Sequence, residues 1–146
     1  MMTLEHDDLK NELCFLFYVA SKEVIKKYAT HLKSYDLTYT SYITLKAIQP
    51  NEVVNIKTLG NRIYLNSGTL TPLIKKLDQK GFVQKLRNED DERNLNISLT
   101  EKGVEVRDYL FKVTNEVYKE LNFEGDDMEQ LVQVLERFIK NNFNQD

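Results

Sequence analysis

Cys14 is the only cysteine of this 146-residue chain, and three tyrosines, Tyr18, Tyr28 and Tyr39, follow it at intervals of 4, 14 and 25 residues. If their hydroxyl groups converge on the sulfur, the chain senses oxidants, because a thiol reacts as a thiolate that its neighbours must stabilise. On a continuous helix a step of 14 residues returns to nearly the same face but spans about 21 Å along the axis. Tyr28 therefore reaches Cys14 only from a second, antiparallel copy of the helix.

The composition argues against several other kinds of site. One cysteine cannot close an intrachain disulfide, and two histidines do not form a metal-binding cluster, so we expect no metal and no cofactor. With 41% hydrophobic and 29% charged residues, the chain has the balance of a globular protein. It has neither the pattern of a signal peptide nor an apolar run that could span a membrane, so we expect a cytoplasmic protein with no membrane partner.

Charge is distributed unevenly along the chain, whose net charge is −3. Residues 55–100 carry eight Lys or Arg against five Asp or Glu, whereas residues 101–146 carry six against eleven. The middle of the chain is therefore basic although the whole is acidic. A local basic surface is what binding to a phosphate backbone requires.

Hydrophobic periodicity predicts a long amphipathic helix over residues 8–33 and a second helix over residues 38–48, capped by Thr38. Asn55 caps a short third helix. A turn at Asn66-Ser67-Gly68 leads into a fourth helix that ends at Lys80, with Gly81 as its stop. Two short helices joined by a tight turn are typical of a helix-turn-helix.

The hydrophobic period then changes. Alternating apolar and polar residues on both sides of the polar segment 88–93 predict a small β-hairpin with a charged tip. Thr100 caps a fifth helix over residues 101–121, and a sixth covers about residues 126–143. The expected fold class is mainly α with a small β wing, a winged helix-turn-helix flanked by long terminal helices that form a dimer.

The wing carries a specific resemblance. Asp91-Glu92-Arg93 at its tip and Leu99-Thr100-Glu101-Lys102-Gly103 after it match the sequences Asp-x-Arg and Leu-Thr-x-x-Gly of the MarR family of bacterial transcription regulators. Cys14, its tyrosines and the segment Ser67–Leu73 further resemble the one-cysteine organic-hydroperoxide sensors of that family. Asn66 and Lys85 depart from the family pattern, which usually has an acidic residue and often an arginine there.

The resemblance covers nearly the whole chain and implies a single MarR-type domain, residues 1–146. Residues 1–50 would serve dimerisation and sensing, residues 51–100 would form the winged helix-turn-helix, and residues 101–146 would be dimerisation helices.

The resemblance also implies binding to double-stranded DNA. The fourth helix would enter the major groove, while Arg93, held by Asp91, would enter a minor groove with A·T-rich flanks. The acidic run 89–92 would repel phosphate unless it pairs with Arg87 and Arg93. Leu70, Leu73, Ile74 and Leu77 of this helix would pack on the core. The alternative for Thr69, Lys75 and Lys76 is an ordinary solvated helix face. The candidate DNA-binding residues are Ser67, Thr69, Thr71, Lys75, Lys76, Arg87, Asp91 and Arg93.

One winged unit covers one half-site, so we expect a homodimer on a near-palindromic operator. The apolar residues available for dimerisation are Leu9, Leu13, Phe17, Phe111, Tyr118, Leu121, Leu131, Leu135, Phe138 and Ile139. The alternative is that these residues complete the core of a monomer.

The resemblance implies that Tyr28 and Tyr39 of the partner subunit donate hydrogen bonds to Cys14, with Tyr18 close by. Lys10, one helical turn before Cys14, would add a positive charge. An oxidant would convert Cys14 to a sulfenic acid, which a low-molecular-weight thiol or a backbone nitrogen could cap, and the operator would be released.

Other functions stay open at this point. A lone cysteine on an apolar helix face is usually inert. A phenolic ligand could act in a pocket lined by Tyr18, Tyr28, Tyr39 and Tyr42. Cys14 could also serve a thiol peroxidase assisted by His6 or His31, although no second cysteine would complete its turnover. A last possibility is a dimer that binds another protein through its acidic terminal helices.

Overall fold

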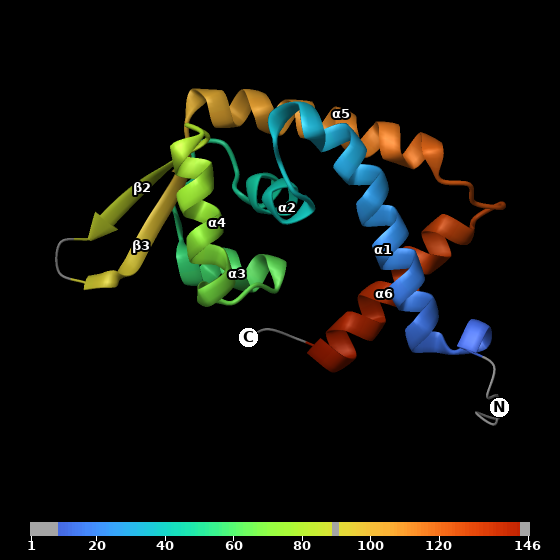
Figure 1. Ribbon diagram of the computed structural model, residues 1–146. Helices are drawn as coiled ribbons and strands as arrows, with labels where there is room; N and C mark the ends of the chain where they lie inside the picture. The colour runs from blue at the N-terminus through green and yellow to red at the C-terminus, as the bar shows by residue number, and fades with distance from the viewer. Residues whose placement is uncertain (1–8, 89–90, 144–146) are drawn as a thin grey trace. The chain divides into compact units, whose positions relative to one another are not determined.

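The computed structural model describes residues 9–88 and 91–143, apart from the side chains of residues 87, 88 and 91–93. The chain divides into two compact units, Met1–Tyr39 and Thr40–Asp146. The first contains one long helix, and the second contains the helix-turn-helix and the wing (Figure 1). The single-domain arrangement inferred from the family pattern stays a prediction.

The first unit is built on α1, Leu13–Leu32. A 3₁₀ turn, Leu9–Asn11, precedes it, and the extended backbone of Glu12 (φ −77°, ψ 128°) separates the two. The predicted continuous helix is therefore interrupted. Because Lys10 lies in the 3₁₀ turn, the prediction that it stands one helical turn before Cys14 on the same helix is wrong.

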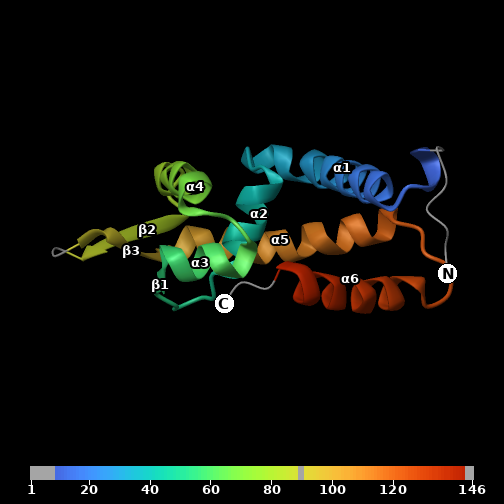
Figure 2. The same ribbon diagram turned by 90° about the horizontal axis from the view of Figure 1, so that it is seen from below.

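The second unit contains the other elements. Helix α2, Tyr39–Ala47, leads into it, and the remaining elements are β1 (Val54–Asn55), α3 (Ile56–Ile63), α4 (Ser67–Gln79), β2 (Val83–Asn88), β3 (Asp91–Leu99), α5 (Glu101–Glu120) and α6 (Asp127–Phe143). The sheet is antiparallel in the order β1-β3-β2. The hairpin β2–β3 extends away from the helices in both views (Figures 1 and 2). Strand β1 was not expected, because two residues are too few to show an alternating pattern.

Side-chain caps start α3 and α5 at the residues that the sequence predicts. The side chain of Asn55 accepts a hydrogen bond from the backbone N–H of Lys57 (2.8 Å), and that of Thr100 accepts one from Gly103 (3.0 Å). Asn66 caps α4 in the same way, so Ser67 and Gly68 are already helical. The predicted turn therefore lies too far toward the C-terminus. The observed turn begins at Tyr64, whose left-handed backbone (φ 59°) ends α3 and redirects the chain.

The core of the second unit lies where α3, α4 and α5 meet the base of the wing. Leu70, Ile74 and Leu77 are buried along α4, as the helical pattern predicts, whereas Leu73 is half-buried. Their partners in the core include Leu45, Ile48, Leu59, Val83, Ile97, Val106, Leu110, Val113 and Val117. This core fixes α4 against the wing and leaves its other face exposed.

Candidate DNA interface and redox site

Helix α4 presents the polar face that a recognition helix needs. All five residues that the sequence nominated on it, Ser67, Thr69, Thr71, Lys75 and Lys76, are exposed, on the sides of the helix away from its buried leucines and isoleucine. Hydroxyl and ammonium groups are the groups that contact base edges and phosphates. The helix contains no acid in its first turn, so its amino-terminal end would not repel DNA.

The wing is described as a backbone hairpin. Strands β2 and β3 pair from Val83 with Leu99 to Asn88 with Asp91, with a register shift after Arg87. The side chains of Arg87, Asp91 and Arg93 lie outside the described part of the chain, so their roles stay predictions. Lys85, which stands where the family often has arginine, lies 3.8 Å from a carboxylate oxygen of Asp78.

The motif Leu-Thr-x-x-Gly has a structural role at the base of the wing. The hydroxyl of Thr100 donates to the backbone carbonyl of Gly81 (2.5 Å) and accepts from Gly103. Gly103 packs so closely that a Cβ atom there would collide with the carbonyl oxygen of Phe82. Because Phe82 also accepts a hydrogen bond from the backbone N–H of Thr100 (3.1 Å), the motif joins α5 to the start of β2.

An ion pair that the sequence pattern did not reveal holds α3. The guanidinium of Arg62 binds both carboxylate oxygens of Glu52, at 2.8 and 2.7 Å, and also donates to the carbonyl of Ala47 (2.9 Å). The backbone N–H of Gln49 donates to the same carboxylate (3.1 Å). The hydrogen bonds from Arg62 and then from Gln49 lower the pKa of Glu52 from 4.5 to about 2. The loop after α2 is thereby fastened to the first helix of the helix-turn-helix.

A second contact cluster, which we call the Lys46 cluster, joins α2 to α5. The ammonium group of Lys46 donates to the hydroxyls of Thr114 (2.9 Å) and Tyr42 (3.0 Å), which also hydrogen-bond to each other. Lys46 and Arg107 lie over the ring of Phe111, at 4.5 and 5.0 Å from its centroid. Arg107 donates to the backbone carbonyl of Lys46 (3.2 Å). The residues lie far apart in sequence, so spacing alone could not identify the cluster.

Cys14 lies at the start of α1 and is exposed, so an oxidant can reach its sulfur. Tyr28 lies toward the other end of the helix and is buried, and its ring stacks on that of Tyr39 with centroids 5.0 Å apart. Fourteen residues of helix separate Cys14 from Tyr28 by about 21 Å. The first unit thus brings the two predicted tyrosines together but not to the cysteine of the same chain. Tyr18 is 59% exposed near Cys14.

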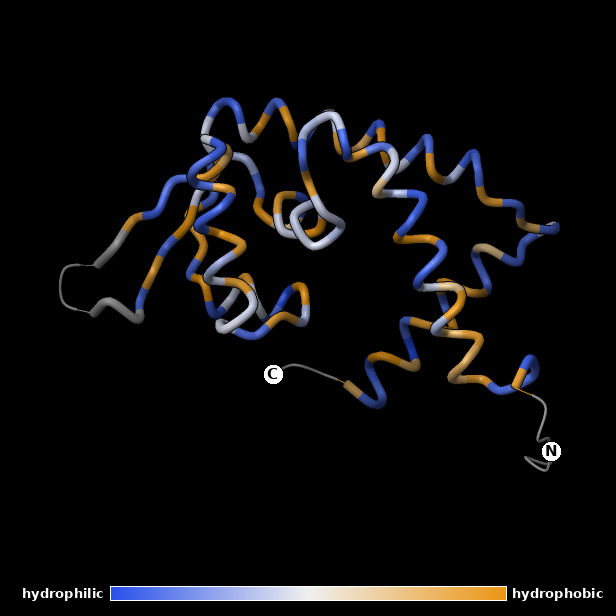
Figure 3. The backbone as a smooth tube through the Cα atoms, in the orientation of Figure 1, coloured by the Kyte–Doolittle hydropathy of each residue, from blue (hydrophilic) through white to orange (hydrophobic). Residues whose placement is uncertain are grey.

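The terminal helices carry apolar side chains that the single chain leaves accessible. None of the ten residues nominated for dimerisation is buried, and α6 has no buried residue at all. Leu13 is 61% exposed, Tyr118 48% and Leu131 47%. Figure 3 shows hydrophobic positions recurring along α1 and α6. These ten residues are therefore not part of the buried core of the described chain.

Two classes of site find no support in the described residues. His, Cys, Asp and Glu side chains nowhere gather there in a group of three that could hold a metal ion. Among the helices of the same residues, none has the length and apolar character of a membrane span.

A helix-turn-helix followed by a β wing, with an exposed polar recognition helix, defines a winged helix-turn-helix transcription regulator. Residues 25–110 match the model of the SarA/Rot transcriptional regulators, and the chain belongs to that family. It is 49% identical over 142 residues to the HTH-type transcriptional regulator SarZ of Staphylococcus haemolyticus, with 97% of each chain covered. The relatives are named regulators, which leaves the thiol-peroxidase alternative without support.

Solved structures agree with this assignment. The chain superposes on reduced AbfR bound to DNA with a TM-score of 0.74 and 30% identity, over 91% of this chain and 93% of that one. It also superposes on overoxidized AbfR bound to DNA with a TM-score of 0.73 and 30% identity over the same shares. The expectation of a winged-helix regulator of MarR type is confirmed.

Proposed function

We propose that this chain binds a near-palindromic operator as a homodimer and releases it when Cys14 is oxidised. The observation that carries the proposal is the separation of Cys14 from the stacked pair Tyr28 and Tyr39. Cys14 is exposed at one end, whereas Tyr28 and Tyr39 are stacked near the other. Tyr18 lies one helical turn from Cys14, whereas the axial distance means that the hydroxyl of Tyr28, and with it the stacked Tyr39, can reach the sulfur only from a second copy.

The accessible apolar faces of α1, α5 and α6 support the second copy. A dimer that buries them would remove large hydrophobic side chains from water, at about 25 cal/mol for each Å². If α1 pairs with α1 of the other copy in an antiparallel sense, Cys14 of one subunit meets Tyr28 and Tyr39 of the partner subunit. The dimer would place two α4 helices on successive half-sites.

The proposed switch begins when the thiolate of Cys14 attacks the terminal oxygen of an organic hydroperoxide. The O–O bond breaks, an alkoxide leaves and takes a proton, and Cys14 becomes a sulfenic acid. A low-molecular-weight thiol then forms a mixed disulfide with loss of water, because the chain has no second cysteine. The added group displaces the tyrosine hydroxyls and shifts the dimer helices, which changes the spacing of the two recognition helices.

DNA would be read by α4 in the major groove and by Arg93 in the minor groove. We propose that the five exposed α4 residues and the wing residues Arg87, Asp91 and Arg93 make these contacts, with preference for A·T-rich flanks. Truncation of Arg93 to alanine should weaken operator binding by about 1–3 kcal/mol. Unchanged affinity of Arg93→Ala would refute the role of the wing. A regulator with this role acts where the DNA is, so the cytoplasm is its expected location.

The decisive experiment measures binding to DNA from the protein's own upstream region by fluorescence anisotropy, before and after cumene hydroperoxide is added together with a low-molecular-weight thiol. Cys14→Ser serves as the matched control, and intact mass identifies the oxidised species at each point. We expect loss of binding in the wild type only, at the dose that gives the mixed disulfide, with recovery on adding a reducing thiol.

Overoxidation is followed separately, since one AbfR structure is described as overoxidized and bound to DNA. Binding that persists when Cys14 is fully in the mixed disulfide would refute the switch and leave DNA binding intact. Release of DNA from Cys14→Ser by a phenolic acid would instead favour the ligand-controlled alternative.

A further inference from the structure

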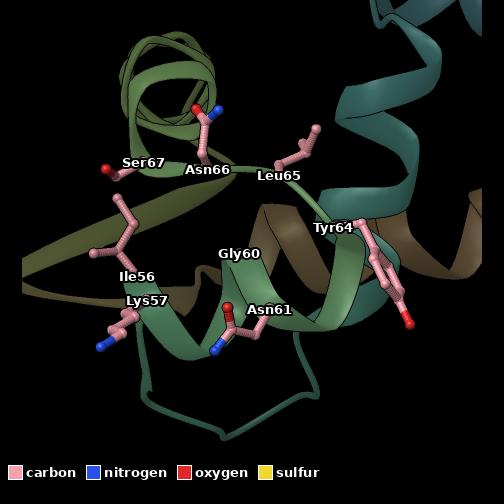
Figure 4. A pocket seen from close by; sticks show the side chains of 8 residues that line it. All are labelled: Ile56, Lys57, Gly60, Asn61, Tyr64, Leu65, Asn66 and Ser67. Atoms are coloured by element: carbon pink, nitrogen blue, oxygen red, sulfur yellow. The ribbon is translucent and has the colours of Figure 1, made fainter. Parts of the chain in front are cut away.

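A hollow opens between α3 and the start of α4. Its volume is about 540 Å³, far more than the roughly 30 Å³ that a water molecule occupies in the liquid. Its lining contains one cationic side chain, several neutral polar groups and no acid: Ile56, Lys57, Gly60, Asn61, Tyr64, Leu65, Asn66 and Ser67 (Figure 4). The absence of an acid and the presence of a lysine favour an anionic occupant.

The polar side chains of the hollow are available for a ligand. Lys57, Asn61 and Ser67 are all exposed, and their side chains make no hydrogen bond or ion pair to the described residues. The other basic residue of α3 is engaged, since Arg62 is paired with Glu52. Within the described part of the chain, α3 therefore uses Arg62 to hold the fold, whereas Lys57 makes no such contact and can bind a ligand.

The floor of the hollow is firmly built. At Gly60 a Cβ atom would lie 2.5 Å from the carbonyl oxygen of Leu65, so the turn packs directly on the backbone of α3. The Asn66 cap fixes the start of α4. Figure 4 shows Ile56 and Lys57 of α3 below Ser67 at this start. The polar groups of the two helices are thus held at one edge of the recognition helix.

The position of the hollow identifies the anion. A helix with its side chains is about 10–12 Å across and fills a major groove about 12 Å wide, so a sugar-phosphate backbone borders it on each side. We propose that Lys57, Asn61 and Ser67 bind the sugar-phosphate backbone of one operator strand in this hollow. Lys57 pairs with a phosphate, while the amide of Asn61 and the hydroxyl of Ser67 donate to neighbouring oxygens. The assignment rests on the proposed docking of α4 in the major groove.

A contact with the sugar-phosphate backbone positions the protein on DNA and does not read bases, so its loss should weaken binding to every duplex equally. Lys57→Gln should lower affinity for the operator and for an unrelated duplex by the same factor, about fivefold at 0.15 M salt, and should reduce the slope of log affinity against log salt by about 0.9. Asn61→Ala and Ser67→Ala should each lower affinity by about twofold to tenfold without changing the slope, because they remove neutral donors.

The experiment compares these variants with Lys119→Gln, a lysine paired with Glu116 on α5, which should bind as the wild type does. Equal thermal midpoints show that each variant is folded. Methylphosphonate scanning then neutralises one phosphate at a time. We expect one position to weaken the wild type but to leave Lys57→Gln unaffected.

Several results would overturn the inference. One is an unchanged slope for Lys57→Gln, and another is a loss confined to the operator sequence. A third is a scan in which no position distinguishes Lys57→Gln from the wild type. Wild-type protein that binds no duplex at low salt would instead refute the proposed DNA binding itself, and this contact with it.

Discussion

Replacing Glu52 by glutamine tests whether the ion pair with Arg62 holds the helix-turn-helix together. The carboxylate of Glu52 accepts two hydrogen bonds from Arg62 and one from the backbone of Gln49, and these contacts lower its pKa from 4.5 to about 2. A carboxylate whose pKa is lower in the folded than in the unfolded protein stabilises the fold above its unfolded pKa. That stabilisation disappears as the pH falls from about 4.5 toward 2.

The magnitude follows from the size of the shift and the exposure of the pair. A fall of about 2.5 pKa units corresponds to about 3.4 kcal/mol at most. The side chains of Glu52 and Arg62 are 25% and 37% exposed, so solvent screens part of this energy. We expect Glu52→Gln to lower the free energy of unfolding by about 1–2 kcal/mol at pH 7, and by little at pH 2.5.

The assay is urea denaturation followed by circular dichroism at pH 7, 5, 4 and 2.5. Glu116→Gln is the matched control, because Glu116 forms a more exposed pair with Lys119 and should contribute only about 0–1 kcal/mol. A difference between Glu52→Gln and the wild type that stays constant across this pH range would refute the role of the carboxylate charge. A negligible difference at pH 7 would refute the role of the ion pair altogether.

Three other predictions test the base of the wing, the Lys46 cluster and the dimer. Gly103→Ala should destabilise the fold by about 1–3 kcal/mol, since its Cβ would meet the carbonyl oxygen of Phe82. Equal thermal midpoints of Gly103→Ala and an exposed control, Glu105→Ala, would argue against this close contact. Thr114→Val should lower the free energy of unfolding, measured by urea denaturation, by about 1–3 kcal/mol, because it removes a hydroxyl that is hydrogen-bonded to the ammonium group of Lys46. Thr114→Ser keeps the hydroxyl and should not lower it. Similar losses in both variants would point to packing instead. Leu131→Asp should shift the protein from dimer to monomer in sedimentation velocity at micromolar concentration, and a persistent dimer would exclude α6 from the interface.

The helices and their caps could be predicted because they depend on neighbours in sequence. Asn55 and Thr100 each accept a hydrogen bond from a backbone N–H two or three residues later, a purely local contact. The apolar period of α4 likewise follows from its own residues. The exposed polar side of the recognition helix therefore follows from the sequence of that helix alone.

The tertiary structure decided what depends on residues far apart in the chain. The bond between Lys46 and Thr114 and the close approach of Gly103 to Phe82 exist only because α5 packs on elements that precede it. Glu52, which precedes β1, is also joined to Arg62 near the end of α3, a pairing that no periodicity reveals. The hollow beside Ser67 arises from the packing of two helices, so Lys57 and Asn61 carried no signal of their own.

The sensing residues combine both kinds of information. Sequence by itself determined that Cys14 lacks a second cysteine and that helical rise keeps Tyr28 about 21 Å away on the same helix. Only the tertiary structure decided that Tyr28 is buried against a stacked Tyr39 while the sulfur stays exposed. The physical reason is that helical rise is a local property of the backbone, whereas burial and stacking depend on where distant segments pack.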